Sequence, residues 1–296
     1  MNANSGIVSA QLAARCDDLA PPDPGQLEES TAPPGTILAV NVAGGEIHRF
    51  TTTGIDLEQL PLPSEVRAPI RYLTLHPDGQ HLAFLAGTAP AALWVVDLDT
   101  GAASSSTAPT CMDWESPGTD LWAFVGTPPD DFIARIQIDG TFDQSSRLSL
   151  DGCPYRYDAD RLAVSRPRVD GGPPQIDLVA KTEGAPLPLV TSSCSLVGPR
   201  ISPNSKELLL TAGCRTDARS GVYVSDADGK RLRQLARGVG TAATWSPDGT
   251  WFTYGAYSPD AAGDGELLRV IISSTDGEVS GVVTPAGYSW PIWIAE

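Results

Sequence analysis

The sequence is poor in lysine and histidine and contains no long hydrophobic run. Its 296 residues include three Lys and three His against 36 acidic residues, and the formal net charge is −16. Such an acidic chain repels phosphate backbones, so we expect no nucleic-acid partner. No stretch reaches the roughly 18 apolar residues of a membrane span, which we therefore do not expect. The first twenty residues also lack the basic and apolar regions of a secretory signal.

Recognisable catalytic and metal-binding motifs are also missing. The sequence has no Gly-x-Ser-x-Gly, no His-Glu-x-x-His, no phosphate-binding glycine loop and no Cys-x-x-Cys. The three histidines fall on different predicted strands and turns, and we do not expect them to share a metal: His48, His76 and His81. One acidic loop is a weak calcium candidate through Asp260, Asp264 and Glu266, but it lacks the remaining oxygen ligands. We therefore expect no cofactor.

The sequence is rich in turn-forming residues and contains a repeat. The chain has 29 Gly and 26 Pro, which suits many short strands joined by turns. Five segments share an apolar strand, a tight turn and a second apolar strand, and they begin at Leu75, Trp114, Tyr155, Ile201 and Trp245. Their spacing of about 39 to 46 residues is the period of a propeller blade.

The rest of each unit predicts two more strands, and the chain ends complement each other. An apolar, β-branched run ending at a glycine turn follows each segment, and a short strand follows that run. Residues 36–62 supply such a unit without its first strand, whereas residues 288–294 resemble a first strand alone. We therefore predict an all-β, six-bladed β-propeller over residues 36–296, with four-stranded antiparallel blades and the first blade closed by the C-terminal strand. The alternative is a β-sandwich followed by a second β-domain.

Residues 1–35 differ in composition from the repeat. They are acidic and Pro-rich, with Leu27 the one core former in the stretch 20–35 and helical spacing confined to residues 7–19. We expect this segment to be a largely disordered tail.

The turn motifs resemble those of a known family. The segments Trp245-Ser-Pro-Asp-Gly and Val222-Tyr-Val-Ser-Asp-Ala-Asp-Gly resemble the WD-like repeat of TolB-type β-propellers, and weaker matches extend over about residues 36–296. The resemblance concerns the propeller module, because 35 residues are too few for the α/β domain that precedes it in TolB. It implies a fold and leaves the function open, since such propellers serve as binding scaffolds, peptidase gates and parts of enzymes. The large residues at the turns, such as Trp114, Tyr155 and Trp245, are expected to pack between blades.

The cysteines indicate a compartment. In the four-strand scheme, two pairs are placed near one face: Cys111 with Cys153, and Cys194 with Cys214. Disulfides at these pairs would favour a periplasmic or extracellular location, with Cys16 left over. The alternative is a cytoplasmic protein with five partly buried thiols.

Charged residues suggest a binding face. The loops between the second and third strands of each blade share one face with the starts of the first strands, and we call it the loop face. On blades four and five it carries Arg166, Arg168, Arg200, Arg215 and Arg219. Acidic residues occupy the corresponding loops of blades three and six: Asp130, Asp131, Asp260, Asp264 and Glu266. Such a face can orient a charged partner. The alternative is local pairing of these arginines with Asp170 and Asp217.

The central funnel is the default binding site, where we expect Arg71, Asp113, Asp151 and Arg200. We favour a non-enzymatic, monomeric scaffold that docks a protein or peptide on the loop face around this channel. The alternative is a metal-dependent hydrolase or lactonase-type propeller with Asp113 and Asp151 as ligands in the channel.

Overall fold

The structure of the chain is a computed structural model. The structure describes residues 27, 31–88, 91–107, 109–115, 120–125, 132–137, 139, 141–168, 170–182, 185–192, 194–213, 220–237, 243–257 and 268–295. These residues form strands and turns, and no helix among them is long and apolar enough to cross a membrane.

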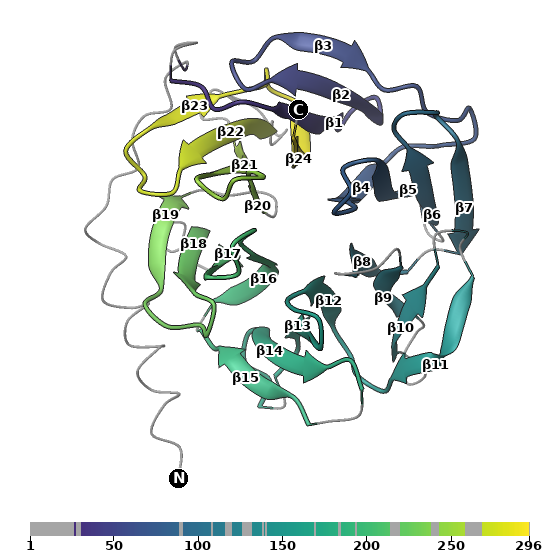
Figure 1. Cartoon of the computed structure of the whole chain (residues 1–296), viewed down its shortest axis with the longest axis vertical. Helices are drawn as coiled ribbons and strands as arrows, with labels where there is room; N and C mark the ends of the chain where they lie inside the picture. The colour runs from purple at the N-terminus through teal and green to yellow at the C-terminus, as the bar shows by residue number, and fades with distance from the viewer. Residues whose placement is uncertain are drawn as a thin grey trace.

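The described residues form twenty-four strands in six four-stranded antiparallel sheets around a common centre (Figure 1). Blade 1 contains β24 (Tyr288–Ile294), β1 (Thr36–Asn41), β2 (Glu46–Thr51) and β3 (Asp56–Gln59). Blade 2 contains β4 (Ile70–Leu75), β5 (His81–Ala86), β6 (Ala92–Asp97) and β7 (Ala103–Thr107). Blade 3 contains β8 (Cys111–Trp114), β9 (Leu121–Val125), β10 (Phe132–Ile136) and β11 (Phe142–Leu148).

The second half of the chain repeats this arrangement. Blade 4 contains β12 (Cys153–Arg156), β13 (Arg161–Arg166), β14 (Gln175–Ala180) and β15 (Leu187–Val190). Blade 5 contains β16 (Ser195–Ile201), β17 (Glu207–Gly213), β18 (Gly221–Asp226) and β19 (Arg233–Arg237). Blade 6 contains β20 (Thr244–Trp245), β21 (Trp251–Tyr257), β22 (Leu268–Ser274) and β23 (Ser280–Val282). The all-β, six-bladed prediction is therefore confirmed, and the β-sandwich alternative is wrong.

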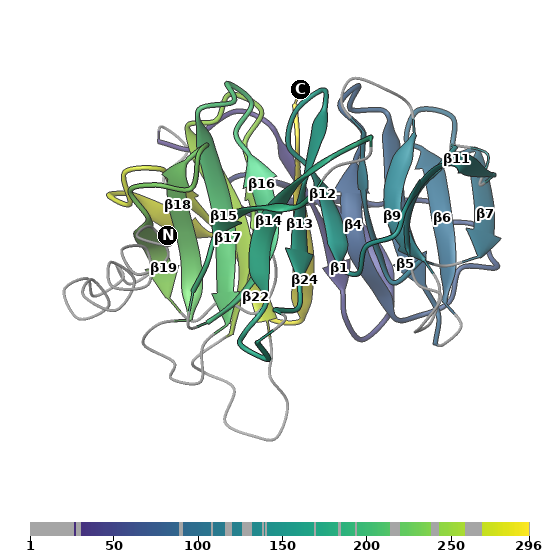
Figure 2. The same cartoon turned by 90° about the horizontal axis from the view of Figure 1, so that it is seen from below.

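The second and third strands of a blade are its most continuously buried strands, as blade 2 illustrates. The second strand β5 and the third strand β6 each bury four or more consecutive residues, because neighbouring blades cover both of their faces. The outermost strand β3 is exposed along its whole length. Strands buried on both faces read as continuous apolar runs rather than as alternating patterns. The side view in Figure 2 shows the strands standing side by side, with turns gathered on two opposite faces of the ring.

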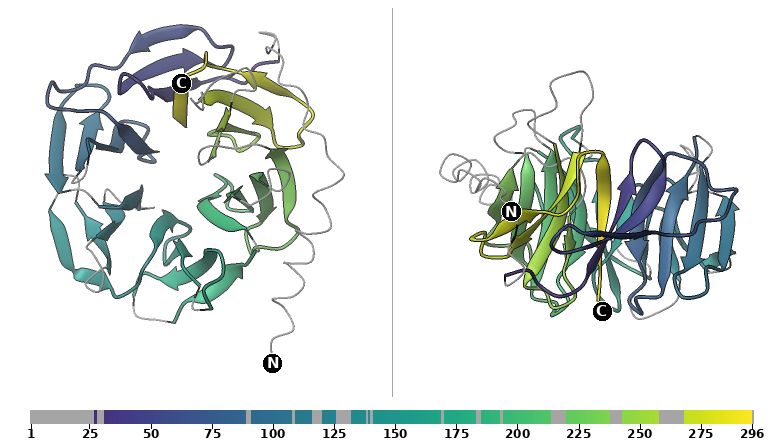
Figure 3. Two further views of the ribbon diagram at one scale, coloured as in Figure 1. Left: turned by 180° about the vertical axis from the view of Figure 1, so that it is seen from behind. Right: turned by 90° about the horizontal axis from the view of Figure 1, so that it is seen from above.

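The ring closes between the first and last strands. Strand β24 pairs antiparallel with β1, so that Ile37 lies opposite Trp293 and Leu38 opposite Ile292. In Figure 3 the yellow β24 stands beside the purple β1. This closure gives β1 a partner on both sides and confirms the prediction from the complementary chain ends.

The repeated turns act as expected from their residues. In blade 6 the Asp248 carboxylate accepts a hydrogen bond from the Ser246 hydroxyl at 2.6 Å and from the Thr250 amide at 3.0 Å. The indole of Trp245 donates across the blade boundary to the Arg200 carbonyl at 2.8 Å, and Trp114 donates to the Thr74 carbonyl at 3.0 Å. The large turn residues therefore join neighbouring blades as well as filling space.

The part of the predicted tail that the structure describes contacts the propeller. Leu27 packs beside Gly281 on β23, where a Cβ atom would approach the Leu27 side chain to 2.4 Å. The Pro33 carbonyl accepts a hydrogen bond from the Thr52 hydroxyl at 2.7 Å. Residues 1–26, including the segment 7–19, lie outside the described residues. The boundary at residue 36 and the disorder of the tail stay predictions.

Candidate functional site

Two chambers open along the central channel. The turn chamber, about 560 Å³, is lined by the turns after β4, β12, β16 and β20 and by the end of β24; His76, Tyr157, Ser202, Ser246 and Trp293 belong to it. The loop chamber, about 210 Å³, lies toward the starts of the innermost strands and is lined by residues that include Tyr72, Tyr155, Val197, Arg200 and Trp290. Arg200 and Thr244 line both chambers, so they mark where the two meet.

A buried carboxylate at this junction ties four blades together. Asp113 on β8 accepts hydrogen bonds from the Thr74 hydroxyl at 2.6 Å and from the Arg156 amide at 2.9 Å. The guanidinium of Arg200 forms an ion pair with the same carboxylate. These partners come from blades 2, 4 and 5. Although burial raises the pKa of Asp113, the positive charges of Arg200 and Arg156 and the Thr74 hydrogen bond lower it below its usual value.

The loop chamber owes its shape to a bulge repeated in three innermost strands. The pairing register shifts between Arg71 and Thr74 on β4 and between Val197 and Arg200 on β16. On β24 it shifts between Ser289 and Ile292, which pair with Val40 and Leu38 of β1. The first extra residue of each bulge has a left-handed backbone: Tyr72 with φ 56°, Gly198 with φ 60° and Trp290 with φ 53°. Bulges re-aim side chains at the rims of sheets.

Two bulky aromatic residues thus adopt a conformation that usually favours glycine, and such outliers cluster at functional sites. Tyr72 and Trp290 lie against each other, with ring centroids 5.0 Å apart. Across the chamber the Arg200 guanidinium lies 5.2 Å from the centroid of the Tyr155 ring. Burial raises the pKa of Tyr155 to about 12, so its hydroxyl stays protonated at neutral pH. The chamber therefore combines aromatic faces with one cation.

The other predicted binding residues are placed less centrally. Arg71 is half-buried on β4. Arg166 contacts Asp151 at 3.3 Å and Asp177 at 3.6 Å. Arg168 forms an ion pair with Asp170, as the alternative of local pairing predicts. Arg215, Arg219, Asp217 and the calcium candidates Asp260, Asp264 and Glu266 lie outside the described residues, as do Asp130 and Asp131.

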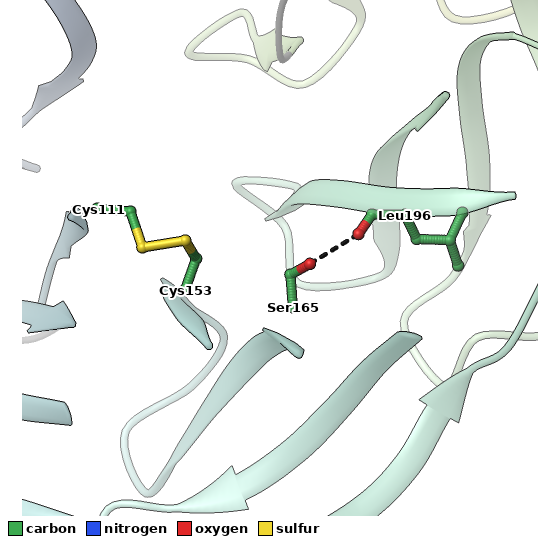
Figure 4. The surroundings of a disulfide bond; sticks show 4 residues. All are labelled: Cys111, Cys153, Ser165 and Leu196. Atoms are coloured by element: carbon green, nitrogen blue, oxygen red, sulfur yellow. Dashed lines mark hydrogen bonds between the residues drawn. A yellow bond between two sulfur atoms is a disulfide. The ribbon is translucent and has the colours of Figure 1, made fainter. Parts of the chain in front are cut away.

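One of the two predicted disulfides is present. Cys111 at the start of β8 is bonded to Cys153 at the start of β12, which joins blades 3 and 4 beside the loop chamber (Figure 4). Figure 4 also shows the Ser165 hydroxyl donating to the Leu196 carbonyl at 2.7 Å, which links blade 4 to blade 5. Cys194 is buried and disulfide-bonded. Its predicted partner Cys214 lies outside the described residues, as does Cys16, so that pairing stays a prediction.

Two of the three histidines lie together, although they were predicted on different elements and not expected to share a metal. His76 and His81 flank the same hairpin turn, and each places its Nδ1 atom within 3 Å of the Asp78 carboxylate. Although burial raises the pKa of Asp78, hydrogen bonds from the Gln80 amide and from the two imidazoles lower it to about 2. His48 lies on blade 1, 3.1 Å from Asp56.

The arrangement defines a six-bladed β-propeller with a two-chambered channel, and its fold is that of a TolB-like β-propeller. No protein-family model matches the chain, and no curated protein does. Among solved structures, TolB from Acinetobacter baumannii has a TM-score of 0.71 at 19% identity, covering 90% of this chain and 68% of that chain. A putative TolB from Agrobacterium tumefaciens has a TM-score of 0.58 at 14% identity, with 88% and 90% covered.

A further similar structure carries the name of an enzyme. A putative 6-phosphogluconolactonase from Bacteroides fragilis gives a TM-score of 0.51 at 12% identity, with 91% of this chain and 97% of that chain covered. At such identities the likeness establishes the fold alone. A shared fold does not imply a shared function, which resides in the channel and the surface of this chain.

Proposed function

We propose that this protein is a monomeric, non-enzymatic binding propeller that docks a protein or peptide on the loop face around the channel. The observation that carries the proposal is the loop chamber, where Tyr72, Tyr155 and Trp290 surround a space of about 210 Å³. Aromatic side chains and arginine are the residues that most often anchor a docked partner. Val197, 40% exposed at the same chamber, adds apolar surface to it.

Arg200 supports the same proposal through its place at the chamber. Its guanidinium is paired with Asp113 and lies 5.2 Å from the centroid of the Tyr155 ring, so a positive charge lines the chamber beside an aromatic face. The chamber therefore suits a partner segment that combines an apolar side chain with an oxygen acceptor.

The carboxylates argue against the enzymatic alternative of a metal in the channel. Both oxygens of Asp113 are engaged by groups of the protein itself, and Asp151 contacts Arg166. A cation at Asp113 would have to displace Arg200 and the Arg156 amide. We accordingly prefer docking to metal-dependent hydrolysis.

The proposed compartment is the periplasm or the cell exterior. The support is the disulfide between Cys111 and Cys153, since disulfides persist in oxidising compartments and are rare in the cytoplasm.

Docking is tested by placing a charge at the loop chamber. We expect Val197→Asp to reduce the capture of the partner at least tenfold, measured by chemical cross-linking of purified protein in an extract of the producing organism followed by mass spectrometry. The matched control is Val279→Asp, because Val279 is 36% exposed but lies in the β22–β23 turn, on the opposite face. Both substitutions are at exposed positions, where the free energy of unfolding should change by no more than about 0.5 kcal/mol. Equal capture by both variants and the wild type, or capture of nothing, would overturn the proposal.

A further inference from the structure

Two of the three histidines in the chain flank a single turn. The segment His76-Pro-Asp-Gly-Gln-His81 connects β4 to β5, and the His76 amide donates to the His81 carbonyl at 2.8 Å. The two residues are therefore neighbours across the hairpin, where side chains on adjacent strands come within contact distance. Their ring centroids are 5.8 Å apart.

The turn brings a carboxylate to both imidazoles. Asp78 Oδ2 lies 2.8 Å from His76 Nδ1 and 2.9 Å from His81 Nδ1. The three residues can each offer one ligand atom such that all three atoms lie within 4.8 Å of one another. Two imidazole nitrogens and a carboxylate oxygen are a common ligand set for zinc, with a fourth position left for water or another molecule.

The contact between His76 and Asp78 occupies the place that a cation would take. His76 Nδ1 lies 2.8 Å from Asp78 Oδ2, to which it donates a hydrogen bond when it carries the proton. The Asp78 amide lies 3.2 Å from the same nitrogen. A metal ion bound between Nδ1 and Oδ2 would replace this proton.

The surroundings differ between the two rings. His76 is buried, and its ring packs edge-to-face against Trp114 with centroids 4.8 Å apart. The other nitrogen of His81, Nε2, lies 3.9 Å from Asp97 Oδ2. This distance is too long for a hydrogen bond, so Asp97 adds negative charge near His81 without fixing its ring.

Equivalent turns in other blades show that the hairpin does not need these histidines. Ser202 in blade 5 and Ser246 in blade 6 occupy the position of His76 and bond the turn through their hydroxyl groups. Asn204 occupies the position of Asp78 and accepts from the Lys206 amide at 3.0 Å. The two imidazoles are therefore an addition specific to blade 2.

We propose that His76, Asp78 and His81 form a binding site for a divalent first-row transition metal of the zinc type. His76 also lines the turn chamber, so the site stands at the rim of that chamber, where a donor group of a bound molecule can complete the coordination. The site is independent of docking at the loop chamber and involves neither Asp113 nor Asp151.

The test is a titration of tag-free protein with Zn²⁺ by isothermal calorimetry, together with metal analysis of the purified protein. We expect one Zn²⁺ per chain in the wild type, and an affinity at least tenfold lower in His76→Ser and in Asp78→Asn. Both variants carry the residues that blade 5 uses in the same turn, so they should keep the fold, which a thermal melt without metal verifies. Added Zn²⁺ should raise the melting temperature of the wild type but not of the variants.

The matched control is His48→Gln. His48 also contacts a carboxylate, Asp56 at 3.1 Å, but has no second imidazole there, so this variant should bind Zn²⁺ as the wild type does. Absence of saturable binding in the wild type, or equal affinity in the wild type and in folded His76→Ser, would overturn the proposal and leave a cluster held by hydrogen bonds alone.

Discussion

The variant Asp113→Ala is expected to lose about 3–5 kcal/mol of unfolding free energy, because it leaves the buried charge of Arg200 without its partner. Two further groups, the Thr74 hydroxyl and the Arg156 amide, lose their acceptor at the same time. For a domain of this size the melting temperature should fall on the order of 10 °C. Urea unfolding followed by tryptophan fluorescence measures the loss, and all four connected blades should unfold together.

Two comparisons distinguish the loss of the buried ion pair at Asp113 from the loss of an exposed ion pair. Asp158→Ala removes the partner of Arg161 in a more exposed pair, whose contribution should stay below about 1 kcal/mol. In a double-mutant cycle, Asp113→Ala with Arg200→Ala should cost less than the two single losses added together, because neither buried charge remains. If the losses of unfolding free energy are additive, or if Asp113→Ala and Asp158→Ala have equal effects, then Asp113 does not connect the four blades as described.

Removing the disulfide between blades 3 and 4 is expected to cost about 4 kcal/mol, from the loop-closure entropy of a cross-link between residues 42 apart in sequence. The variant to measure is Cys111→Ser with Cys153→Ser, since a reductant would also act on the disulfide of Cys194. Its urea midpoint should fall clearly below that of the wild type under oxidising conditions.

Thiol labelling of the wild type tests whether the cross-link forms in the producing cells. In wild-type protein isolated without reductant, Cys111 and Cys153 should be blocked. Free thiols at both positions, or an unchanged urea midpoint in the double variant, would contradict the disulfide and remove the main support for a periplasmic or extracellular location.

The fold could be predicted almost completely because its information is local and repeated. Most blades contain a recognisable turn motif, such as the Ser-Pro-Asp-Gly after Trp245. The spacing between these motifs gives the length of one blade. The missing strand at the start and the surplus strand at the end then predict the pairing of β1 with β24. Adjacent strands joined by short turns leave few other topologies.

The site could be predicted only in part because its contacts cross several blades. Asp113 and Arg200 were expected in the channel, but nothing local indicates that Thr74, Arg156 and Arg200 converge on one carboxylate. The left-handed residues Tyr72 and Trp290 are not glycines, so they give no signal themselves. Pro199 and Pro291 are local signals of the bulges on β16 and β24, because proline within a strand is confined to edges and bulges. The bulge at Tyr72 has no such signal. The histidine pair did have a signal, since residues flanking a four-residue turn face each other across a hairpin.

Strand β24 is synthesised after all the other strands, and this order affects how blade 1 folds. Until β24 is synthesised, β1 has an unpaired inner edge, and this strand carries the fully buried run Ile37, Leu38, Ala39 and Val40. Apolar edges of this kind recruit strands from other chains. Blade 1 is thus the place where an incomplete chain should aggregate or need a chaperone. At high concentration β24 is also the segment that two copies can exchange, each completing the first blade of the other.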